Sequence, residues 1–449
     1  MLSVEDNELL TQVGPATPMG NLMREYWMPI YLSSDIAAND SKPERIKLLG
    51  EHLVIFRDTQ GRAGLLSEVC AHRGASLYWS RNEESGLRCV YHGWKYDVTG
   101  ACVDMPSEPA ASNFRDKVHL RSYPLQERNG IVWAYMGPRE TPPPLPDLEF
   151  NVLPSEHTMI RRDLQHTNWV QGLEGNIDSS HLSFLHTRLT PDGSADFVGP
   201  SPFNRGLYYE DVAPRMEVVP TDVGVMYAAG RAEEEGKRYW RVTQFLMPFY
   251  GMFAPVSLAE CPIQWWIPLD DNAVMKWDVR WNPNRPITDA EREFLILPDP
   301  GGFVEWTGDA YSHWRLNASL ENDYLNDYSA QLDKRFSGIP SVNLQDKAIL
   351  ESMGHVVDRQ REHLGTSDAM IIRVRRRLID AAIALRDHGT VPPGVDDPQK
   401  YRRRTATVIL DEEDDWQKEA GPYLEAFSEL PVLSAEAEQA SSRSGEARP

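Results

Sequence analysis

Two short segments, each with one cysteine and one histidine, constrain the fold of this chain most strongly. Cys70 and His72 are separated by one residue and Cys89 and His92 by two, and residues 73–88 lie between the pairs. Two thiolates and two imidazoles are the ligands of a [2Fe–2S] cluster in which two histidines replace two cysteines on one iron. The same four side chains suit a structural zinc ion, so the spacing alone leaves both metals open.

The residues around these ligands favour the iron–sulfur cluster. The two segments read CAHRGASL and CVYHGWKYDVTG, with a glycine within two residues after each histidine. Glycine allows backbone amides to approach the sulfur atoms of a cluster. The segments resemble the Rieske motif. Respiratory Rieske proteins carry a disulfide at the places held here by Ala75 and Tyr91, so the resemblance is to the low-potential oxygenase type.

Composition excludes several classes of protein. A chain of 449 residues with 41% hydrophobic residues can form two or three globular units. Its net charge of -21 opposes binding to nucleic acid and to anionic lipid surfaces. No run of 18 apolar residues and no basic, apolar leader is present, so we expect no membrane span and a cytoplasmic protein. With only four cysteines, Cys102 and Cys261 are expected to be buried free thiols in a reducing compartment.

The distribution of apolar segments predicts an α+β protein with two folded domains. Residues 1–150 contain short apolar runs punctuated by Gly, Pro and Asp, which is typical of antiparallel β-structure. The segment ETPPPLPDLEF (140–150) has four prolines and predicts a linker. Beyond it we expect a helix over 168–186, and then an antiparallel sheet built from the runs VGVMYAAGRA, RYWRVTQFLMPFYGMF, IQWWIPL and AVMKWDVRW.

Helical periodicity returns near the end of this second domain, which we place at 151–410. Helices are predicted at LQDKAILESM and from Ser367 to His388, where Gly389 gives a stop signal. Residues 411–449 form an acidic tail with eleven acidic and three basic side chains. Its last part has little to bury and is expected to be disordered.

A second candidate metal site lies in NWVQGLEGNIDSSHLSFLH, which contains Asp178, His181 and His186. On a regular helix Asp178 and His181 share a face, but positions five apart point about 140° away from each other. The helix must therefore bulge or end before His186. Two histidines and one carboxylate can bind one face of Fe(II) and leave positions open for O₂ and substrate. Each histidine could equally be a buried core residue and Asp178 an exposed acid.

The carboxylate ligand is predicted by elimination to be Asp346. In QDKAILESM the positions three, four and seven beyond it are Ile349, Leu350 and Met353, which predicts an acid on an apolar face. A buried carboxylate is costly unless it is paired or bound to a metal. Asp346 could instead be a capping acid or a buried paired acid. The other nearby acids have ordinary explanations: Glu351 and Asp358 as solvated partners of basic residues, and Asp368 in the first turn of the last helix.

Two arginines are candidates for binding a substrate carboxylate. Alternation along RYWRVTQF puts Arg241 on one strand face with Tyr239 and Phe245. A guanidinium among aromatic rings can clamp a carboxylate. Arg205, in SPFNRGLYY, is a second candidate. Either arginine could instead pair with an internal acid or extend to the surface.

Together these segments resemble the oxygenase (α) subunits of Rieske non-haem iron aromatic-ring-hydroxylating oxygenases, nearest the phthalate dioxygenase-like branch, over roughly residues 5–390. The resemblance implies an N-terminal all-β Rieske domain and a catalytic domain with a helix-covered antiparallel sheet of the helix-grip type. It implies a Rieske cluster and a mononuclear Fe(II) as cofactors. It also makes Asp178 the carboxylate that links His181 to the partner subunit's His92.

The resemblance further implies a head-to-tail homotrimer, in which each cluster serves the iron of the neighbouring subunit. The activity would be O₂-dependent hydroxylation of a small aromatic substrate, either cis-dihydroxylation or O- or N-demethylation by monooxygenation. No convincing Gly-rich dinucleotide fingerprint occurs, so a separate NAD(P)H-dependent flavin reductase is expected, with or without a ferredoxin. The alternative function is a Rieske electron-transfer protein without reactive mononuclear iron.

Overall fold

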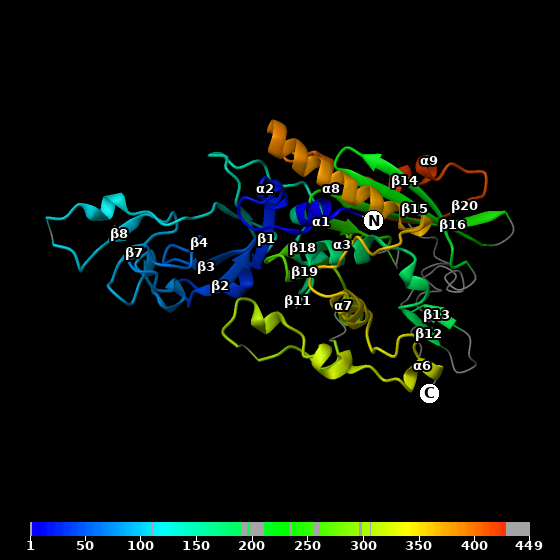
Figure 1. The fold of residues 1–449 in the computed structure, drawn as a ribbon, viewed down its shortest axis with the longest axis horizontal. Coiled ribbons are helices and arrows are strands. Elements are labelled where there is room, and N and C mark those ends of the chain that lie inside the picture. Colours follow the sequence, from blue (N-terminus) through cyan, green and yellow to red (C-terminus); the bar gives the residue numbers. More distant parts are fainter. Residues whose placement is uncertain are drawn as a thin grey trace.

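The structure is a computed structural model with two regions of different architecture. It describes residues 2–109, 111–189, 195–197, 211–233, 236–255, 261–295, 299–305 and 307–427. Small antiparallel sheets lie at one end of the molecule, and a larger sheet covered by helices lies at the other (Figure 1). This arrangement confirms the predicted α+β class, with an all-β N-terminal region and a helix-covered antiparallel sheet.

The N-terminal region contains three small sheets. Strand β3 (Glu51–Arg57) is buried on both faces: Val54 and Phe56 join one hydrophobic cluster, and Leu53 and Ile55 join the main core. This explains why its sequence is a continuous apolar run. The sheet orders are β2-β3-β4, β5-β6-β7-β8 and β1-β10-β9. The other strands are β1 (Trp27–Leu32), β2 (Glu44–Leu48), β4 (Ala63–Ser67), β5 (Arg81–Glu83), β6 (Gly86–Arg88), β7 (Lys95–Tyr96), β8 (Cys102–Asp104), β9 (Leu125–Arg128) and β10 (Ile131–Tyr135).

The large sheet has eight strands and is antiparallel throughout. Its order is β11-β19-β18-β17-β16-β15-β14, and β20 pairs with β16. The four apolar runs predicted as strands belong to this sheet, where β15 pairs with β16 and β18 pairs with β19. The strands are β11 (Thr158–Gln165), β14 (Arg215–Thr221), β15 (Gly224–Ala232), β16 (Lys237–Leu246), β17 (Tyr250–Met252), β18 (Cys261–Pro268), β19 (Val274–Trp281) and β20 (Ala406–Asp411).

Helices cover both faces of this sheet. α3 (Trp169–Ile177) and α8 (Ala369–His388) pack on one face, where Val225, Tyr227 and Ala229 belong to the same core. α8 buries Val374, Leu378 and Ala382 at helical spacing and ends as predicted at Gly389, whose φ of +65° suits glycine. α9 (Trp416–Ala420) packs on the other face against Trp240 and Val242.

The remaining elements are short. They include α5 (Asp289–Leu295), α6 (Ala330–Asp333), α7 (Val342–Ser352) and the strand pair β12 (Thr187–Leu189) and β13 (Ala195–Phe197). Among the described residues, no helix combines the length and the apolar character needed to cross a membrane.

Three segments differ from the sequence expectation. The helix predicted over 168–186 ends at Ile177, and a short 3₁₀ turn follows at His181–Ser183. The segment assigned to the acidic tail begins with packed structure, because Trp416 and Leu424 are buried under the sheet. The predicted disorder falls on residues 428–449, outside the described residues. The proline-rich segment is also held in place, since Pro143 O accepts a hydrogen bond from Trp27 Nε1 at 2.6 Å.

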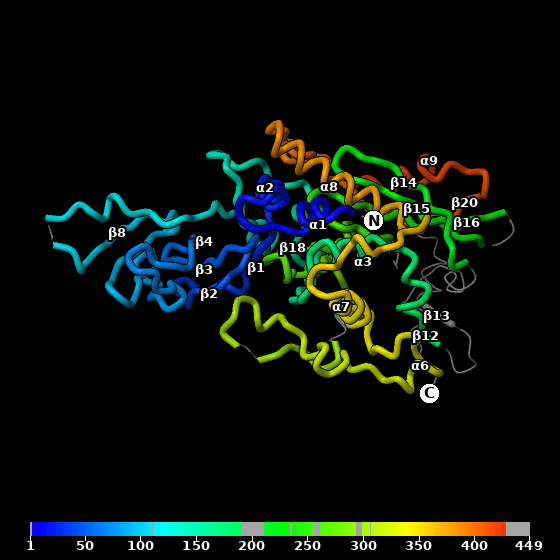
Figure 2. Tube along the Cα trace, viewed as in Figure 1, coloured from blue at the N-terminus to red at the C-terminus, as the bar shows by residue number. Residues whose placement is uncertain are grey.

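The N-terminal helices pack mainly with the second region of the chain, and the second of them also contacts the small sheets, because Arg24 pairs with Glu51 at 3.0 Å. α1 (Val4–Thr11) and α2 (Pro18–Arg24) contact α8, and the tube view places them beside it (Figure 2). Leu10 and Leu22 are fully buried in the main core. The chain therefore starts on the helix-covered sheet, forms the small sheets and returns.

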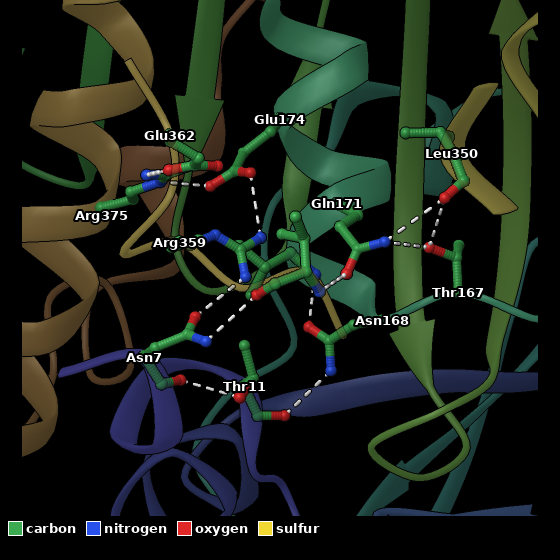
Figure 3. A network of polar contacts seen from close by, with 12 residues as sticks. Asn7, Thr11, Thr167, Asn168, Gln171, Glu174, Leu350, Arg359, Glu362 and Arg375 are labelled. Carbon is green, nitrogen blue, oxygen red and sulfur yellow. Dashed lines mark hydrogen bonds and ion pairs between the residues drawn. The ribbon is translucent and has the colours of Figure 1, made fainter. Parts of the chain in front are cut away.

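A buried network of charged side chains joins α1, α3 and α8 (Figure 3). Glu174 on α3 accepts hydrogen bonds from Arg359 at 3.0 Å and from Arg375 at 2.5 Å. Arg375 also pairs with Glu362, and Arg359 donates to Asn7. Burial raises the pKa of Glu174, but the two guanidinium groups outweigh it, so the pKa lies below its ordinary value. The network holds α3 firmly against α8.

Candidate iron centres

Three predicted ligands, His181, His186 and Asp346, lie together although they come from distant parts of the sequence. Their ligand atoms all lie within 4.8 Å of one another. Nε2 of His181 is 3.1 Å from Nε2 of His186, and Nε2 of His186 is 3.1 Å from Oδ1 of Asp346. Two ring nitrogens and one carboxylate that face a single point are the donor set of a facial-triad Fe(II) site. The donor set therefore fits a mononuclear iron.

The end of α3 explains how two histidines five residues apart can face the same point. Asp178 is the C-cap of α3, with extended backbone at φ -82° and ψ 131°. A 3₁₀ turn then carries His181, and Leu185 N donates to His181 O at 2.8 Å. The chain next enters β12 at Thr187. The break in the helix required by the sequence spacing is therefore present before His186.

Each histidine has a hydrogen-bond partner on the ring nitrogen that faces away from the other ligands. His181 Nδ1 donates to Oδ2 of Asp178 at 3.2 Å, and Oδ1 of Asp178 accepts from Ser180 N at 2.7 Å. His186 Nδ1 lies 2.7 Å from Oε1 of Gln345. Such partners orient a metal-binding ring and select its tautomer.

The acidic groups of the site are held in their charged forms. Burial raises the pKa of Asp346, but His186 and His181 outweigh it and hold the pKa below the ordinary value for an aspartate. Burial likewise raises the pKa of Asp178, but its hydrogen bond with His181 outweighs burial, so the pKa lies below the ordinary value. Burial lowers the pKa of His181, and Asp178 and Asp346 raise it above the usual value for histidine. Both carboxylates are therefore available as anions.

Helix α7 brings Asp346 to the site, but not for the reason that the sequence suggested. The predicted apolar face is only partly present: Leu350 is buried in the main core, but Ile349 is 42% exposed and Met353 is 47% exposed. Glu351 is also not a solvated acid, because it pairs with the buried Lys347 and accepts a hydrogen bond from Tyr324. Lys347 and Glu351 are covered by contacts with other segments of the chain, and the pattern of a single helix does not predict such contacts.

Helices α3 and α7, on which the ligands depend, are linked directly by side chains (Figure 3). Gln171 Nε2 donates to Leu350 O at 3.3 Å and to Gly354 O at 3.0 Å. Its Oε1 accepts from Val357 N at 2.8 Å. Thr167 Oγ1 also donates to Leu350 O, at 3.4 Å. These bonds set the separation between the histidine pair and Asp346.

Arg241 lies on the face of β16 that faces the site. It is buried, sits opposite Ala229 of β15, and donates to Ala254 O at 3.0 Å. Its positive charge lowers the pKa of His181, so the guanidinium lies close enough to interact electrostatically with this candidate iron ligand. Tyr227, on the same face, has a pKa raised to about 12 by burial. The second candidate, Arg205, lies outside the described residues.

The four predicted cluster ligands lie on two loops with the same hydrogen-bonding pattern. Cys70 N donates to Ala75 O at 2.8 Å, and Cys89 N donates to Trp94 O at 2.9 Å, five residues onward in each loop. Gly74 and Gly93 have φ of +73° and +79°, and each donates its N–H to the cysteine carbonyl four residues before it. The glycine spacing thus closes both turns.

The arrangement of these side chains fits a Rieske cluster. Both cysteines are buried, and burial together with the neighbouring Cys70 raises the pKa of the Cys89 thiol. The rings of His72 and His92 lie 4.4 Å apart between centroids. Among the described residues, Nδ1 of His72 is buried without a hydrogen-bond partner, which is costly unless it binds a metal. The donor set is two thiols and two imidazoles, as such a cluster requires.

Comparison with known proteins agrees with both centres. Residues 26–124 match the Rieske [2Fe-2S] domain, and residues 134–439 match the LigXa C-terminal domain like family. The chain belongs to the Rieske non-haem iron oxygenases. As an oxygenase subunit of this family, it is an oxidoreductase that carries a Rieske cluster and a mononuclear iron, so both predicted cofactors are confirmed. The zinc alternative and the pure electron-transfer alternative are not supported.

Three relatives of this Rieske oxygenase have high similarity over most of their length. It is 40% identical to the 3-chlorobenzoate-3,4-dioxygenase oxygenase subunit of Comamonas testosteroni, over 93% of this chain and 97% of that protein. It is 36% identical to the phthalate 4,5-dioxygenase oxygenase subunit of Pseudomonas putida, over 96% and 98%. Identity to the 5,5'-dehydrodivanillate O-demethylase oxygenase subunit of a Sphingobium species is 30%, over 84% and 80%.

The fold of the Rieske oxygenase also occurs in solved structures. The oxygenase in the carbazole-bound oxygenase–ferredoxin complex of carbazole 1,9a-dioxygenase superposes with a TM-score of 0.54 at 22% identity. The match covers 83% of this chain and 93% of that one. Oxygenase subunits of this family work with separate electron-transfer partners, which agrees with the expected external reductase.

Sequence reasoning missed two polar residues at the iron site of this Rieske oxygenase. Gln345 contacts His186, and Gln171 links α3, after which the two histidines follow, to α7, which carries Asp346. Gln345 directly precedes Asp346, so its position beside a candidate ligand was a usable signal. Gln171 had no comparable signal, because its partners are backbone carbonyls almost two hundred positions away in the chain.

Proposed function

We propose that this Rieske oxygenase hydroxylates a small aromatic carboxylate, by cis-dihydroxylation of the ring or by monooxygenation that removes an O- or N-methyl group. The observation that carries the proposal is the buried guanidinium of Arg241 beside the candidate iron site. The names of two relatives, which specify chlorobenzoate and phthalate, support a carboxylate. The O-demethylase relative supports keeping demethylation as an outcome.

We propose that His181, His186 and Asp346 hold the mononuclear iron, and that the cluster is held by Cys70, His72, Cys89 and His92. The convergence of each donor set supports this assignment. The iron, when bound, supplies the site at which O₂ is activated beside the substrate. Arg241 pairs with the substrate carboxylate and turns the ring toward the iron ligands, and Arg205 is proposed as a second contact.

The chain's other residues at this site position protons and exclude water. Asp178 accepts the Nδ1 proton of His181, which leaves Nε2 of that ring free to bind metal. The buried ring of Tyr227 and the neighbouring strand surface keep the substrate region dry. Water exclusion strengthens the pairing between the guanidinium and a carboxylate.

We further propose a head-to-tail homotrimer in which Asp178 links His181 to the partner subunit's His92. The small sheets that carry the cluster loops and the helix α7 lie in separate parts of the chain (Figure 1). Each part exposes large apolar side chains, which supports their contact across an interface. Near the cluster these are Trp79, Val90 and Tyr91, and near the iron site they are Phe184, Tyr328, Leu332 and Phe336.

The electron donor is proposed to be an NAD(P)H-dependent flavin reductase, acting directly or through a ferredoxin. We place the protein in the cytoplasm, because none of the four cysteines forms a disulfide, as expected in a reducing compartment. The boundary between the Rieske and catalytic domains is proposed to lie within residues 140–150, with the catalytic domain extending to about 410 and the acidic tail beyond it.

The substrate proposal is tested by turnover with a surrogate reductase. Benzoates, phthalates and methoxybenzoates are compared with their amides, under isotopically labelled O₂, and the products are identified by mass spectrometry. We expect turnover of the carboxylates and little turnover of the amides. Equal turnover of acids and amides would contradict the carboxylate assignment. Two labelled oxygens in the ring product indicate dihydroxylation. An unlabelled phenol or amine released together with formaldehyde indicates demethylation, because the oxygen added to the methyl carbon leaves with the formaldehyde.

A further inference from the structure

We propose that Gln345 is the positioning residue of His186 and fixes the tautomer in which this histidine binds iron. The inference rests on the proposed iron site and deepens it. Asp178 has the corresponding place beside His181. The two histidines of the site thus have different partners, one a carboxylate and the other a neutral amide.

Two hydrogen bonds fix the Gln345 side chain. Its Oε1 lies 2.7 Å from Nδ1 of His186, and its Nε2 donates to Ile339 O at 2.9 Å. The side chain is 1% exposed and His186 is 2% exposed, so water does not compete for either contact. Gln345 lies on α7, whose N-cap is Ser341, and Ile339 lies just before that helix. The amide therefore connects the segment just before α7 to the ring of His186, which directly precedes β12.

The carbonyl of Ile339 determines which way the amide points. A carbonyl oxygen can only accept, so the Gln345 group facing it must be the NH₂. The Oε1 atom must then face His186, and as an acceptor it requires a proton on Nδ1. In the neutral imidazole only one nitrogen carries a proton, so Nε2 has its lone pair free. That nitrogen faces His181 and Asp346.

The test compares two substitutions that separate the two hydrogen bonds. Gln345→Met has a similar length and removes both bonds. Gln345→Glu keeps an oxygen for His186 but cannot donate to Ile339. The full-length trimeric enzyme is loaded anaerobically with Fe(II), and iron affinity is measured by competition with a chromophoric chelator. The visible spectrum of the Rieske cluster reports folding, and the electron paramagnetic resonance signal of the nitric oxide complex reports the ligand geometry.

Gln345→Met is expected to bind iron about 10- to 100-fold more weakly and to show an altered nitric oxide signal. For Gln345→Glu, the iron affinity and the nitric oxide signal are both expected to stay close to those of the unmodified protein. The matched control is Thr187→Val, which removes a buried hydroxyl bonded to Ser183 O beside His186 without touching the ring. It is expected to leave iron affinity unchanged.

Two results would overturn the role of Gln345. One is unchanged iron affinity and an unchanged nitric oxide signal in Gln345→Met. The other is an equal loss in both Gln345 variants, which would mean that the bond to Ile339 matters and the one to His186 does not. Failure of the iron site itself is distinguishable, because then the unmodified protein and His186→Ala would bind the same amount of iron.

Discussion

Asp178 and His181 form a hydrogen-bonded pair across the end of α3, with 3.2 Å between Oδ2 and Nδ1. The backbone N–H of Ser180 holds the other carboxylate oxygen at 2.7 Å. The pair is possible because the helix ends at Ile177 and leaves Asp178 in an extended conformation. One carboxylate thus orients a proposed iron ligand and, in the proposed trimer, faces the cluster of the neighbouring chain.

The first prediction concerns Asp178→Asn. This variant keeps its shape but loses the negative charge, so both metals should remain while electron transfer between subunits becomes about 10- to 100-fold slower. Stopped-flow measurement of cluster reoxidation in a single turnover checks this. Matched metal contents must be confirmed first. An unchanged rate would refute the linking role of Asp178.

The second prediction concerns Asp346→Ala. Removal of the only carboxylate proposed as an iron ligand should abolish turnover and lower the iron content from about three to about two per chain. The cluster spectrum should be unchanged, because Cys70 and Cys89 lie in the other region. Asp358→Asn on the exposed segment after α7 serves as the control. Full activity in Asp346→Ala would remove this residue from the site.

The third prediction concerns the substrate carboxylate. Arg241→Gln should raise KM for an aromatic carboxylate roughly 10- to 100-fold, since a hydrogen bond to a charged group contributes about 1.5–3 kcal/mol. Turnover of the matching amide should change little. Iron content and the cluster spectrum show whether the buried site still folds. An equal effect on acid and amide would assign Arg241 a structural role through its bond to Ala254.

The fourth prediction concerns the buried charge network (Figure 3). Arg375→Met leaves Glu174 and Glu362 without a shared partner and should lower the free energy of unfolding by about 3–5 kcal/mol. Thermal unfolding monitored by circular dichroism measures the loss. The control is Asp387→Asn, an exposed acid paired with Arg386, for which the change should be below about 1 kcal/mol. Similar losses in both variants would contradict the argument.

The same network predicts how stability depends on pH. Because the folded-state pKa of Glu174 is below its ordinary value, its contribution is complete above the unfolded pKa near 4.5. It is lost as pH falls through the lower, folded pKa. Glu174→Gln should therefore flatten the fall of unfolding free energy on acidification below about pH 4.5. An equally steep fall in the variant would exclude Glu174 as a source of acid sensitivity.

The last prediction concerns the trimer. Val90 is exposed at the tip of the second cluster loop. Val90→Asp should dissociate the trimer or weaken it, because burying a charge in an apolar contact is unfavourable. Val391→Asp, at an exposed apolar position after α8, should not. Analytical ultracentrifugation distinguishes the two. A stable trimer in both variants would place the interface elsewhere.

Local sequence was sufficient for those features that depend on neighbours in the chain. Each cluster loop needs only a cysteine, a histidine and a glycine within five residues, because the turn closes on itself through the bond to the cysteine carbonyl. The strands of the large sheet were likewise predictable from alternating and apolar runs bounded by polar turns. The angle between positions 181 and 186 predicted a break in the helix before His186, although the helix already ends at Ile177.

Tertiary structure alone decided which acid joins the histidines and how the rings are held. Asp346 was selected by elimination and by an apolar face that is only partly present, since Leu350 is buried but Ile349 and Met353 are exposed. It reaches the site because Gln171 and Thr167 tie α7 to α3 through backbone carbonyls. Such bonds depend on the approach of segments almost two hundred residues apart, which no local pattern encodes. The sequence determined the chemistry of the ligands, and long-range packing determined their geometry.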